Sequence, residues 1–467
     1  MPIPLLAALG NINPFEIFPP VLLGITSEAE AGPVVLTGVL LSLVVIYLAS
    51  KVGGELSRLL NLPPVLGELI AGVAVGASAL HLIVFPEGGA TAGSSMLMSL
   101  LSMVEPMTPE LQNYIFHSSS EVVSVLAEIG VIILLFEIGL ESDLRELGKV
   151  GYQAAIVACV GVVTPFAAGT LGLIAFFHVA AIPAIFAGAA LTATSIGITS
   201  KVLSELGYLK SKEGQIIVGA AVIDDVLGII VLAVVASLAK TGEVDLMNVF
   251  FLIAGATVFL LGSILLGKFF NSTFVKLAEV LKTRGYLIIP ALVFAFIMAF
   301  IANVIHLEAI LGAFAAGLVL DETDKRKELD QQILPIADFL VPIFFVTVGA
   351  KVDLSVLNPA NPDNRAGLII AAFLIVVAIF GKIVTGWSII GNKEPINRLA
   401  IGVGMIPRGE VGLVFAGIGT ASGALSPSLQ AAIIVMVILT TFIAPPFLQY
   451  ALSSSEPGEA SVETTGT

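Results

Sequence analysis

Apolar runs of about 20 residues follow one another along most of the chain, and they constrain its fold more than any other feature. A helix needs about 20 apolar residues to cross the roughly 30 Å of hydrocarbon in a bilayer. The chain has thirteen such runs, with approximate bounds of 34–54, 64–82, 121–140, 150–176, 180–204, 213–238, 246–270, 284–305, 307–320, 333–350, 366–390, 396–420 and 428–452. The ninth run is the shortest and is the weakest candidate for a complete crossing of the bilayer. The pattern predicts an all-α integral membrane protein with about 13 transmembrane helices.

The composition suits a bilayer better than it suits water. Of the 467 residues, 57% are apolar and 12% are charged, against roughly 25% charged residues in ordinary soluble domains. The single cysteine, Cys159, excludes an intrachain disulfide and a cysteine-based metal cluster. No catalytic constellation stands out, so we expect a membrane protein that is not an enzyme, binds no nucleic acid and needs no cofactor.

Lysine and arginine are distributed unevenly over alternate loops. The loops after odd-numbered runs, with their flanks, hold sixteen of these residues, whereas the other side holds three. The sixteen are Lys51, Arg58, Arg145, Lys149, Lys201, Lys210, Lys212, Lys268, Lys276, Lys282, Arg284, Lys325, Arg326, Lys327, Lys393 and Arg398, and the three are Lys240, Lys351 and Arg365. Because retained positive charge marks the cytoplasmic side, the N-terminus is predicted outside, the C-terminus inside, and the long loop 83–120 outside.

This topology divides the chain into three parts. Residues 1–33 form an N-terminal segment, and they lack the positive charges that a cleaved signal peptide needs. Residues 34–452 form one transmembrane domain, in which any subdomains are interleaved. Residues 453–467 form an acidic tail, which the charge pattern predicts to be cytoplasmic.

A few charged residues fall inside the apolar runs, where charge is costly. A charge at the centre of a transmembrane helix costs about 2.5 to 3.5 kcal/mol. The five clearest cases are Asp224, Asp225, Lys382, Arg408 and Glu410. Their combined cost, on the order of 12 to 18 kcal/mol, exceeds typical net protein stability. We therefore expect them to pair with one another and to line one polar interior.

Other acidic residues lie nearer the ends of the runs. They are Glu68, Glu128, Glu137, Glu308 and Asp338, and we expect helix-end or packing roles for them.

Two runs carry sequence that interrupts a helix. The fifth holds LTATSIG at 191–197, and the twelfth holds GMIPRG at 404–409. Pro407 removes one backbone donor, and glycine lowers the cost of irregular backbone. The two runs are seven apart, so they cross in opposite directions, as an inverted repeat requires. No repeat is apparent residue by residue, and the symmetry follows from layout alone. Paired broken helices indicate the binding site of a secondary transporter.

Four motifs, taken in their order and spacing, carry a resemblance that spans most of residues 34–450. They are LTATSIGITSKVL at 191–203, AVIDDVLGII at 221–230, FGKIVTGW at 380–387 and GMIPRGEVGLVFA at 404–416. Together they resemble the monovalent cation:proton antiporter family, and within it the bacterial sodium/proton antiporters with an Asp-Asp motif. The resemblance implies a homodimer, in which a dimerisation domain adjoins a six-helix core with two crossed, broken helices.

The resemblance also implies roles for single residues. Asp225 is expected to be the carboxylate that binds sodium, and Asp224 the neighbour that pairs with Lys382 in some states. Thr194 and Ser195 are expected beside the ion, in the unwound crossing region. Family members with Asn in place of the first Asp are generally electroneutral, so this chain is expected to be electrogenic.

Four more residues of the two broken helices are candidates for roles in the site. We expect structural or gating roles for Arg408, Glu410 and Pro407. Thr192 lies in the same unwound stretch as the expected ion ligands, and its hydroxyl is a candidate ligand or a partner for backbone.

The chemistry leads to the same function. A carboxylate removed from water holds its proton until a cation replaces that proton, and such competition at one group is exchange. Sodium is a hard cation that suits the oxygens of Asp225, Thr194, Ser195 and unwound backbone. We therefore predict a sodium/proton antiporter that works by alternating access.

Two alternatives and the choice of membrane stay open. The first alternative is a potassium/proton antiporter of the same superfamily, and the second is a cation channel, which needs a continuous pore. Both a bacterial-type plasma membrane and an internal energy-transducing membrane such as a thylakoid satisfy the charge rule.

Overall fold

The computed structural model describes residues 32–86, 89–104, 107–241, 245–358, 362–389 and 395–453, and in these ranges it contains helices and no strand. The α-helices are α1 (Gly32–Leu59), α2 (Pro64–Val75), α3 (Met96–Val104), α4 (Pro109–Glu141), α5 (Leu144–Phe177), α6 (Ala181–Ala190), α7 (Ile196–Glu205), α8 (Lys212–Thr241), α9 (Leu246–Val280), α10 (Ile288–Val304), α11 (Ala309–Asp321), α12 (Arg326–Ala350), α13 (Pro362–Ile383), α14 (Arg398–Gly404), α15 (Glu410–Ala421) and α16 (Pro427–Ser453). The predicted N-terminal segment and acidic tail fall almost entirely outside the described residues.

Each predicted apolar run overlaps one helix or one interrupted pair of helices. The fifth run corresponds to α6 and α7, and the twelfth corresponds to α14 and α15. Seven of the described helices are long and apolar enough to cross a bilayer by themselves, and shorter apolar helices accompany them. The all-helical membrane fold is thus confirmed, while the number of crossings and the sides of the termini stay predictions.

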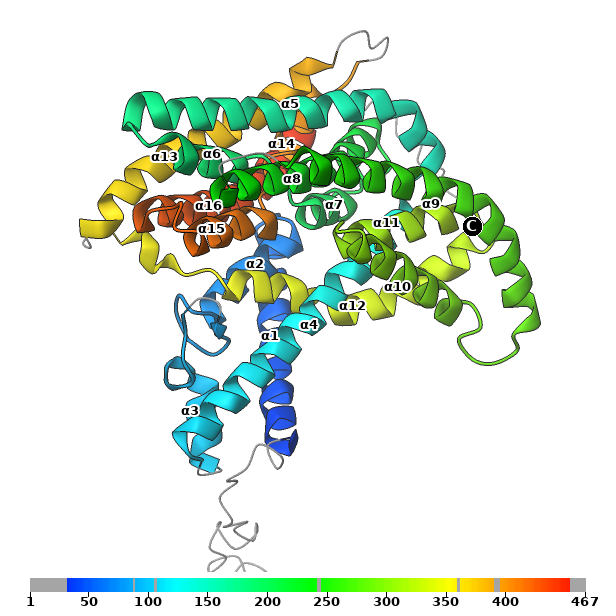
Figure 1. Cartoon of the computed structure of the whole chain (residues 1–467). Helices are drawn as coiled ribbons and strands as arrows, with labels where there is room; N and C mark the ends of the chain where they lie inside the picture. Colours follow the sequence, from blue (N-terminus) through cyan, green and yellow to red (C-terminus); the bar gives the residue numbers. More distant parts are fainter. Residues whose placement is uncertain are drawn as a thin grey trace, which may run out of the picture.

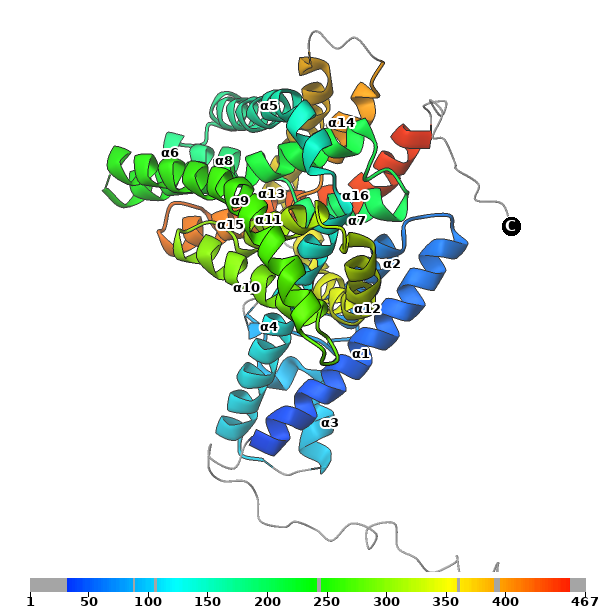
Figure 2. The same cartoon turned by 90° about the vertical axis from the view of Figure 1, so that its right-hand side faces the viewer.

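The external loop predicted for residues 83–120 is wrong in one respect, because much of it is helical. It contains α3 and the first third of α4, which begins at Pro109. Proline suits the first turn of a helix, and the Thr108 hydroxyl caps that turn by accepting a hydrogen bond from Leu111 N at 3.3 Å. Together with the start of α1, these helices form a projection from the rest of the molecule (Figures 1 and 2).

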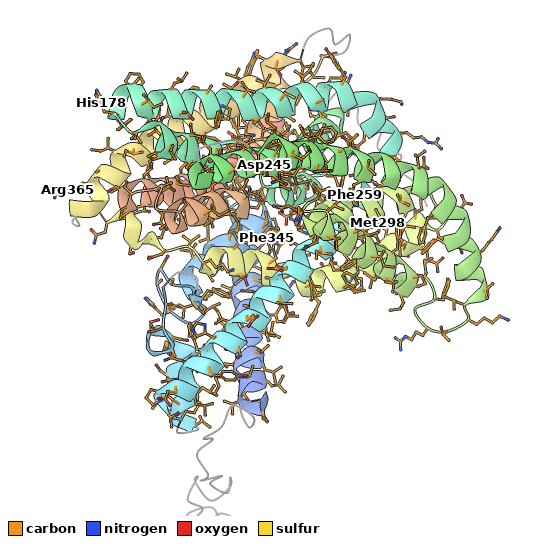
Figure 3. All side chains as sticks on the ribbon, in the orientation of Figure 1. His178, Asp245, Phe259, Met298, Phe345 and Arg365 are labelled. Atoms are coloured by element: carbon orange, nitrogen blue, oxygen red, sulfur yellow. The ribbon has the colours of Figure 1, made fainter. Side chains whose placement is uncertain are left out.

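The helices pack in two groups. In the first group, α4 crosses α11 and α12, α2 packs on α1 and α12, and α10 packs on α11. In the second group, α5 lies along α8, α13 lies along α16, and α15 packs on α6 and α16 (Figure 1). Figure 3 shows His178, at the end of α5, and Arg365, near the start of α13, along the same edge. The two contacting helices α5 and α13 therefore run antiparallel.

The two halves of the chain repeat each other in sequence as well as in layout. Leu-Gly-x-x-x-Ala-Gly occurs in α2 at 66–72 and in α11 at 311–317, and Gly-x-x-x-Asp-Leu occurs at 139–144 and at 349–354. The expectation of no residue-level repeat is therefore wrong. The shared residues are few and mostly small, so they are hard to find among apolar neighbours.

The repeated glycines explain why these positions match. A Cβ on Gly349 of α12 would lie 2.9 Å from the Cα of Gly72 in α2. In the other half, a Cβ on Gly139 of α4 would lie 2.9 Å from the Cα of Gly317 in α11. Small residues let membrane helices approach until their backbones touch. The same close helix contact is therefore built twice, once in each half.

The turns that precede the repeated motifs also match. Asn61 between α1 and α2 has φ 56°, and His306 between α10 and α11 has φ 63°. Each of these residues donates its backbone N–H to the carbonyl three residues earlier, at 3.0 and 2.9 Å. The first turn then leads to Pro63, and the second leads to Glu308 at the equivalent position.

The glycine contact generates a stability prediction. Gly349→Ala places a methyl group 2.1 Å from the carbonyl oxygen of Leu69, and such overpacking costs about 1 to 3 kcal/mol. We expect the variant to unfold at a lower temperature in detergent, as followed by size-exclusion chromatography after heating. Gly255→Ala in α9 is the matched control, because no atom lies within 4 Å of the added carbon. Equal melting of the two variants would show that the close contact is not required.

Candidate functional site

Two interrupted helices cross at the centre of the second group. The helix formed by α6 and α7 breaks at 191–195, and the helix formed by α14 and α15 breaks at 405–409. The two breaks touch, since Ser195 N donates a hydrogen bond to Pro407 O at 2.8 Å. Backbone that leaves a helix within a membrane protein must find such partners, because lipid offers none.

Threonine hydroxyls satisfy further carbonyls at the crossing. Thr194 Oγ1 donates to Met405 O at 3.1 Å, and Thr199 Oγ1 donates to Gly404 O at 2.9 Å. Both acceptors lie at the C-terminal end of α14. The broken helix formed by α6 and α7 therefore covers the carbonyl groups at that end. Thr192 differs, because its hydroxyl donates to Ala189 O at 2.8 Å within its own chain segment. Thr194 thus links the two helices, whereas Thr192 does not.

Arg408 brings a buried positive charge to the same place. Its side chain is 1% exposed, and its Nη1 donates to Ala193 O at 2.9 Å. This carbonyl belongs to the first break, just beyond the C-terminal end of α6, where a helix carries partial negative charge. Arg408 O in turn accepts a hydrogen bond from Thr441 Oγ1 at 2.6 Å. The arginine therefore joins the second break to both the first break and α16.

Glu410, the acidic residue predicted in this broken helix, is the first residue of α15. Its side chain lies outside the part of the chain whose side chains the structure describes.

The two adjacent aspartates of α8 have different surroundings. Successive positions on a helix are about 100° apart, so two neighbouring side chains cannot face the same partner. Asp224 faces Lys382 of α13, whose Nζ lies 3.2 and 3.3 Å from the two carboxylate oxygens, and both side chains are 0% exposed. A Cβ on Gly161 of α5 would lie 3.1 Å from this Nζ. The missing side chain at Gly161 thus leaves room for the lysine.

Asp225 faces a small cavity where the two groups of helices meet. The side chain is 4% exposed. The cavity has about 10 Å³ open to a water-sized sphere, and its lining includes Thr194, Ser195, Glu308 and Gly409. A volume of this order holds about one water molecule, and a single ion without its water shell is smaller still. The cavity is lined by the break between α6 and α7, by α7, α8 and the start of α15 on one side, and by α4, α11 and α12 on the other.

The donor set around Asp225 suits a monovalent cation. A carboxylate, two hydroxyl-bearing side chains and the irregular backbone of residues 193–195 border one space of molecular size. Hard cations prefer such oxygen donors. No group of three or more His, Cys, Asp or Glu side chains among the described residues could hold a metal ion. The arrangement therefore offers the carboxylate of Asp225, with that of Glu308 on the same cavity, and neutral oxygens to a small cation.

The predicted residues are thus divided between three places. Asp224 and Lys382 form a pair, Asp225 shares a cavity with Thr194 and Ser195, and Arg408 lies at the crossing beside Pro407.

Three residues with contacts in this region were not expected there. They are Thr199, Thr441 and Glu308. Thr199 follows Ser195 by four residues and so shares its helix face, which the sequence could have indicated. The other two reach the site through contacts between distant segments.

Known proteins resemble this chain over most of its length. A family model described as the transmembrane sodium/hydrogen exchanger matches residues 39–453. The high-affinity Na(+)/H(+) antiporter NhaS3 of Synechocystis sp. is 62% identical over 451 residues, which cover 96% of this chain and 98% of that protein. The Na(+)/H(+)-K(+) antiporter GerN of Bacillus cereus is 32% identical over 416 residues, which cover 88% of this chain and 95% of GerN.

A solved structure shows the same fold. The sodium proton antiporter MjNhaP1 from Methanocaldococcus jannaschii matches with a TM-score of 0.57 at 16% identity, over 90% of this chain and 96% of that one. The resemblance expected from the four motifs is therefore confirmed. The family model covers nearly all of the described helices. This chain belongs to the sodium/hydrogen exchanger family.

Proposed function

We propose that this protein exchanges sodium ions for protons across a membrane, and that Asp225 carries both in turn. The observation that supports this most directly is the cavity at Asp225, which has room for about one small guest between two groups of helices. Sodium and a proton would compete for the same buried carboxylate. When a sodium ion leaves Asp225 on one side of the membrane, a proton would take its place, and on the other side a sodium ion would replace that proton. This alternation couples sodium transport to proton transport.

Alternating access requires the site to open to one side at a time. Asp225 lies on the boundary between the group containing α4, α11 and α12 and the group containing α6, α7 and α15. A displacement of one group against the other would change which face of the cavity is sealed, while the hydrogen bonds of the crossing move as a unit. The close glycine contacts of α4 with α11 and of α2 with α12 would keep the first group rigid.

The Asp224–Lys382 pair is the proposed origin of charge movement. Exchange of one sodium ion for the one proton on Asp225 moves no net charge. A buried ion pair can take up or release a further proton when the charge beside it changes. Sodium at Asp225 would alter the field at the neighbouring Asp224 and loosen its 3.2 Å contact with Lys382. A second proton per cycle would make the exchange electrogenic.

Potassium is the second candidate cation. GerN, which is 32% identical to this chain, is named a Na(+)/H(+)-K(+) antiporter. Sodium remains the first choice because NhaS3, at 62% identity, is named a Na(+)/H(+) antiporter. A cation channel fits less well, since a cavity of about 10 Å³ is not the continuous pore that conduction needs.

Lipid and a second copy of the chain are the other proposed partners. On α1 an apolar stripe repeats every four residues and is exposed, at Leu36, Leu40, Val44, Leu48, Val52 and Leu56. Such a face suits lipid tails or another helix. We expect a homodimer in a plasma membrane or in an internal energy-transducing membrane such as a thylakoid.

The first test removes the charge of the proposed ion-binding carboxylate. Asp225→Asn keeps the size of the side chain but cannot exchange a proton for a cation, so we expect sodium-dependent proton movement to be abolished. The measurement uses proteoliposomes with an imposed proton gradient and a pH-sensitive dye inside. Asp245→Asn is the matched control, because Asp245 is exposed at the start of α9 and its amide variant can still cap that helix. Undiminished exchange by Asp225→Asn would remove this carboxylate from the mechanism.

The second test concerns the buried pair. Lys382→Met leaves Asp224 buried without its cation, so we expect a loss of about 3 to 5 kcal/mol in the free energy of unfolding. The double variant Asp224→Asn/Lys382→Met removes both charges and should recover most of that stability. We expect it to exchange sodium for protons without net charge movement, as measured by transport currents on solid-supported membranes. Currents equal to those of the unsubstituted protein would contradict the electrogenic role of the pair.

A further inference from the structure

We propose that Glu308 is a second ion-binding carboxylate, which receives the cation at the face where α10 joins α11. This inference rests on the proposed function, because it assigns a further ligand to the same exchange. The Lys and Arg distribution predicts that this face is external, and it is called the outer face below. Glu308 would hold the incoming sodium ion beside Asp225 while the site is open to that face.

The first observation is a shared cavity. Glu308 and Asp225 both border the space of about 10 Å³ that also contacts Thr194 and Ser195. Asp225 reaches it from α8, and Glu308 reaches it from the start of α11, on the opposite side of the boundary between the two groups. A cation in this space would lie between α8, which carries Asp225, and the turn that carries Glu308. Two carboxylates attract a cation more strongly than one.

The second observation is depth. Glu308 precedes Asp321, the last residue of α11, by 13 positions, and Asp225 follows Lys212, the first residue of α8, by 13 positions. At 1.5 Å per residue both carboxylates lie about 20 Å from those helix ends. The Lys and Arg distribution predicts that the two ends belong to the same face, because Lys212 lies beside Lys210 and Asp321 lies just before Lys325 and Arg326. Glu308 is therefore at the height of Asp225, although it belongs to a turn.

This depth has a consequence for access. Because hydrocarbon is roughly 30 Å thick, a turn about 20 Å from the inner end of its helix lies about 10 Å below the outer surface. Because α11 is short, the outer face forms a recess where Glu308 lies. Its side chain is partly exposed, whereas Asp225 is buried. A cation that enters from the outer face would therefore meet the accessible carboxylate of Glu308 before the buried carboxylate of Asp225.

The third observation comes from the repeat. Pro63 occupies the position of Glu308 in the first half of the chain, at the start of α2. There a carboxylate is supplied by another helix, because Glu205 of α7 accepts a hydrogen bond from Val65 N at 3.2 Å. In the second half, the turn carries its own carboxylate. Each of the two equivalent turns therefore has one acid beside it, and the turns lie at opposite faces.

A purely structural role for Glu308 is less consistent with its geometry. Glu308 is the N-cap residue of α11, yet its side chain makes no capping hydrogen bond to that helix. Its backbone carbonyl, which any residue could supply, accepts from Leu311 N at 3.1 Å. The equivalent bond from Leu66 N to Pro63 O is also 3.1 Å. The turn thus forms without a carboxylate, and the start of α11 does not depend on the acid at this position.

The test compares the two faces of the membrane. Sodium-dependent proton movement is measured in right-side-out and everted vesicles, so that the half-saturating sodium concentration is obtained separately for each face. For Glu308→Gln we expect that concentration to rise about tenfold at the outer face, the effect of losing one contact of 1.4 kcal/mol. At the opposite face we expect no change. Glu308→Asp keeps the charge on a shorter arm and should show a smaller rise.

The matched control is Glu128→Gln. Glu128 is another carboxylate in the outer half of the predicted topology, but it borders the neighbouring cavity of about 220 Å³ rather than that of Asp225. We expect this variant to match the unsubstituted protein at both faces. An equal rise for Glu128→Gln would mean that surface charge, and not a ligand at Glu308, sets the sodium dependence.

Three outcomes would overturn the inference. The first is an unchanged half-saturating sodium concentration for Glu308→Gln, and the second is an equal rise of that concentration at both faces. The third applies if Glu308→Gln does not fold, and it is a folded Glu308→Asp whose half-saturating sodium concentration equals that of the unsubstituted protein. Failure of the proposed function would look different, because the unsubstituted protein would then show no sodium-dependent proton movement in either kind of vesicle.

Discussion

The burial of two adjacent carboxylates on α8 is the constraint on which the rest of the site depends. Asp224 and Asp225 are 0% and 4% exposed, and an uncompensated charge in such surroundings is strongly unfavourable. The helix points them in different directions, so each needs its own partner. Asp224 has Lys382, whose Nζ lies beside Gly161. Asp225 has a cavity with oxygen donors, and its counter-ion can therefore be a guest that comes and goes.

The crossing of the broken helices follows from the same constraint. Some of the neutral oxygens near Asp225 come from backbone that is not used in a helix, and such backbone is stable only when its other polar groups are satisfied. Thr194, Thr199 and Arg408 make those bonds between the two breaks. The first group of helices is held together differently, by repeated glycine contacts. The cavity lies at the boundary between the hydrogen-bonded crossing and the first group of helices, which is packed through glycines.

Much of this arrangement could be predicted from local sequence. Pro407 between two nearby glycines favours an interrupted helix, and charges such as Asp225 and Lys382 in apolar runs require a polar interior. The position of Glu308 could not be predicted, because it depends on the length of α11 and on which helices meet across the cavity. The contact of Thr441 with Arg408 likewise joins separate helices. The repeat is hard to recognise in the sequence, because its shared glycines matter through backbone contacts that only the packed structure reveals.

The central claim is that one buried carboxylate holds either a proton or sodium. It is tested most directly by adding sodium to purified protein in detergent with almost no buffer and recording the pH with a dye. Competition predicts that a proton is released whenever sodium binds, that the release saturates with sodium, and that it is absent in Asp225→Asn. Sodium binding that calorimetry detects without any proton release from the unsubstituted protein would contradict the claim.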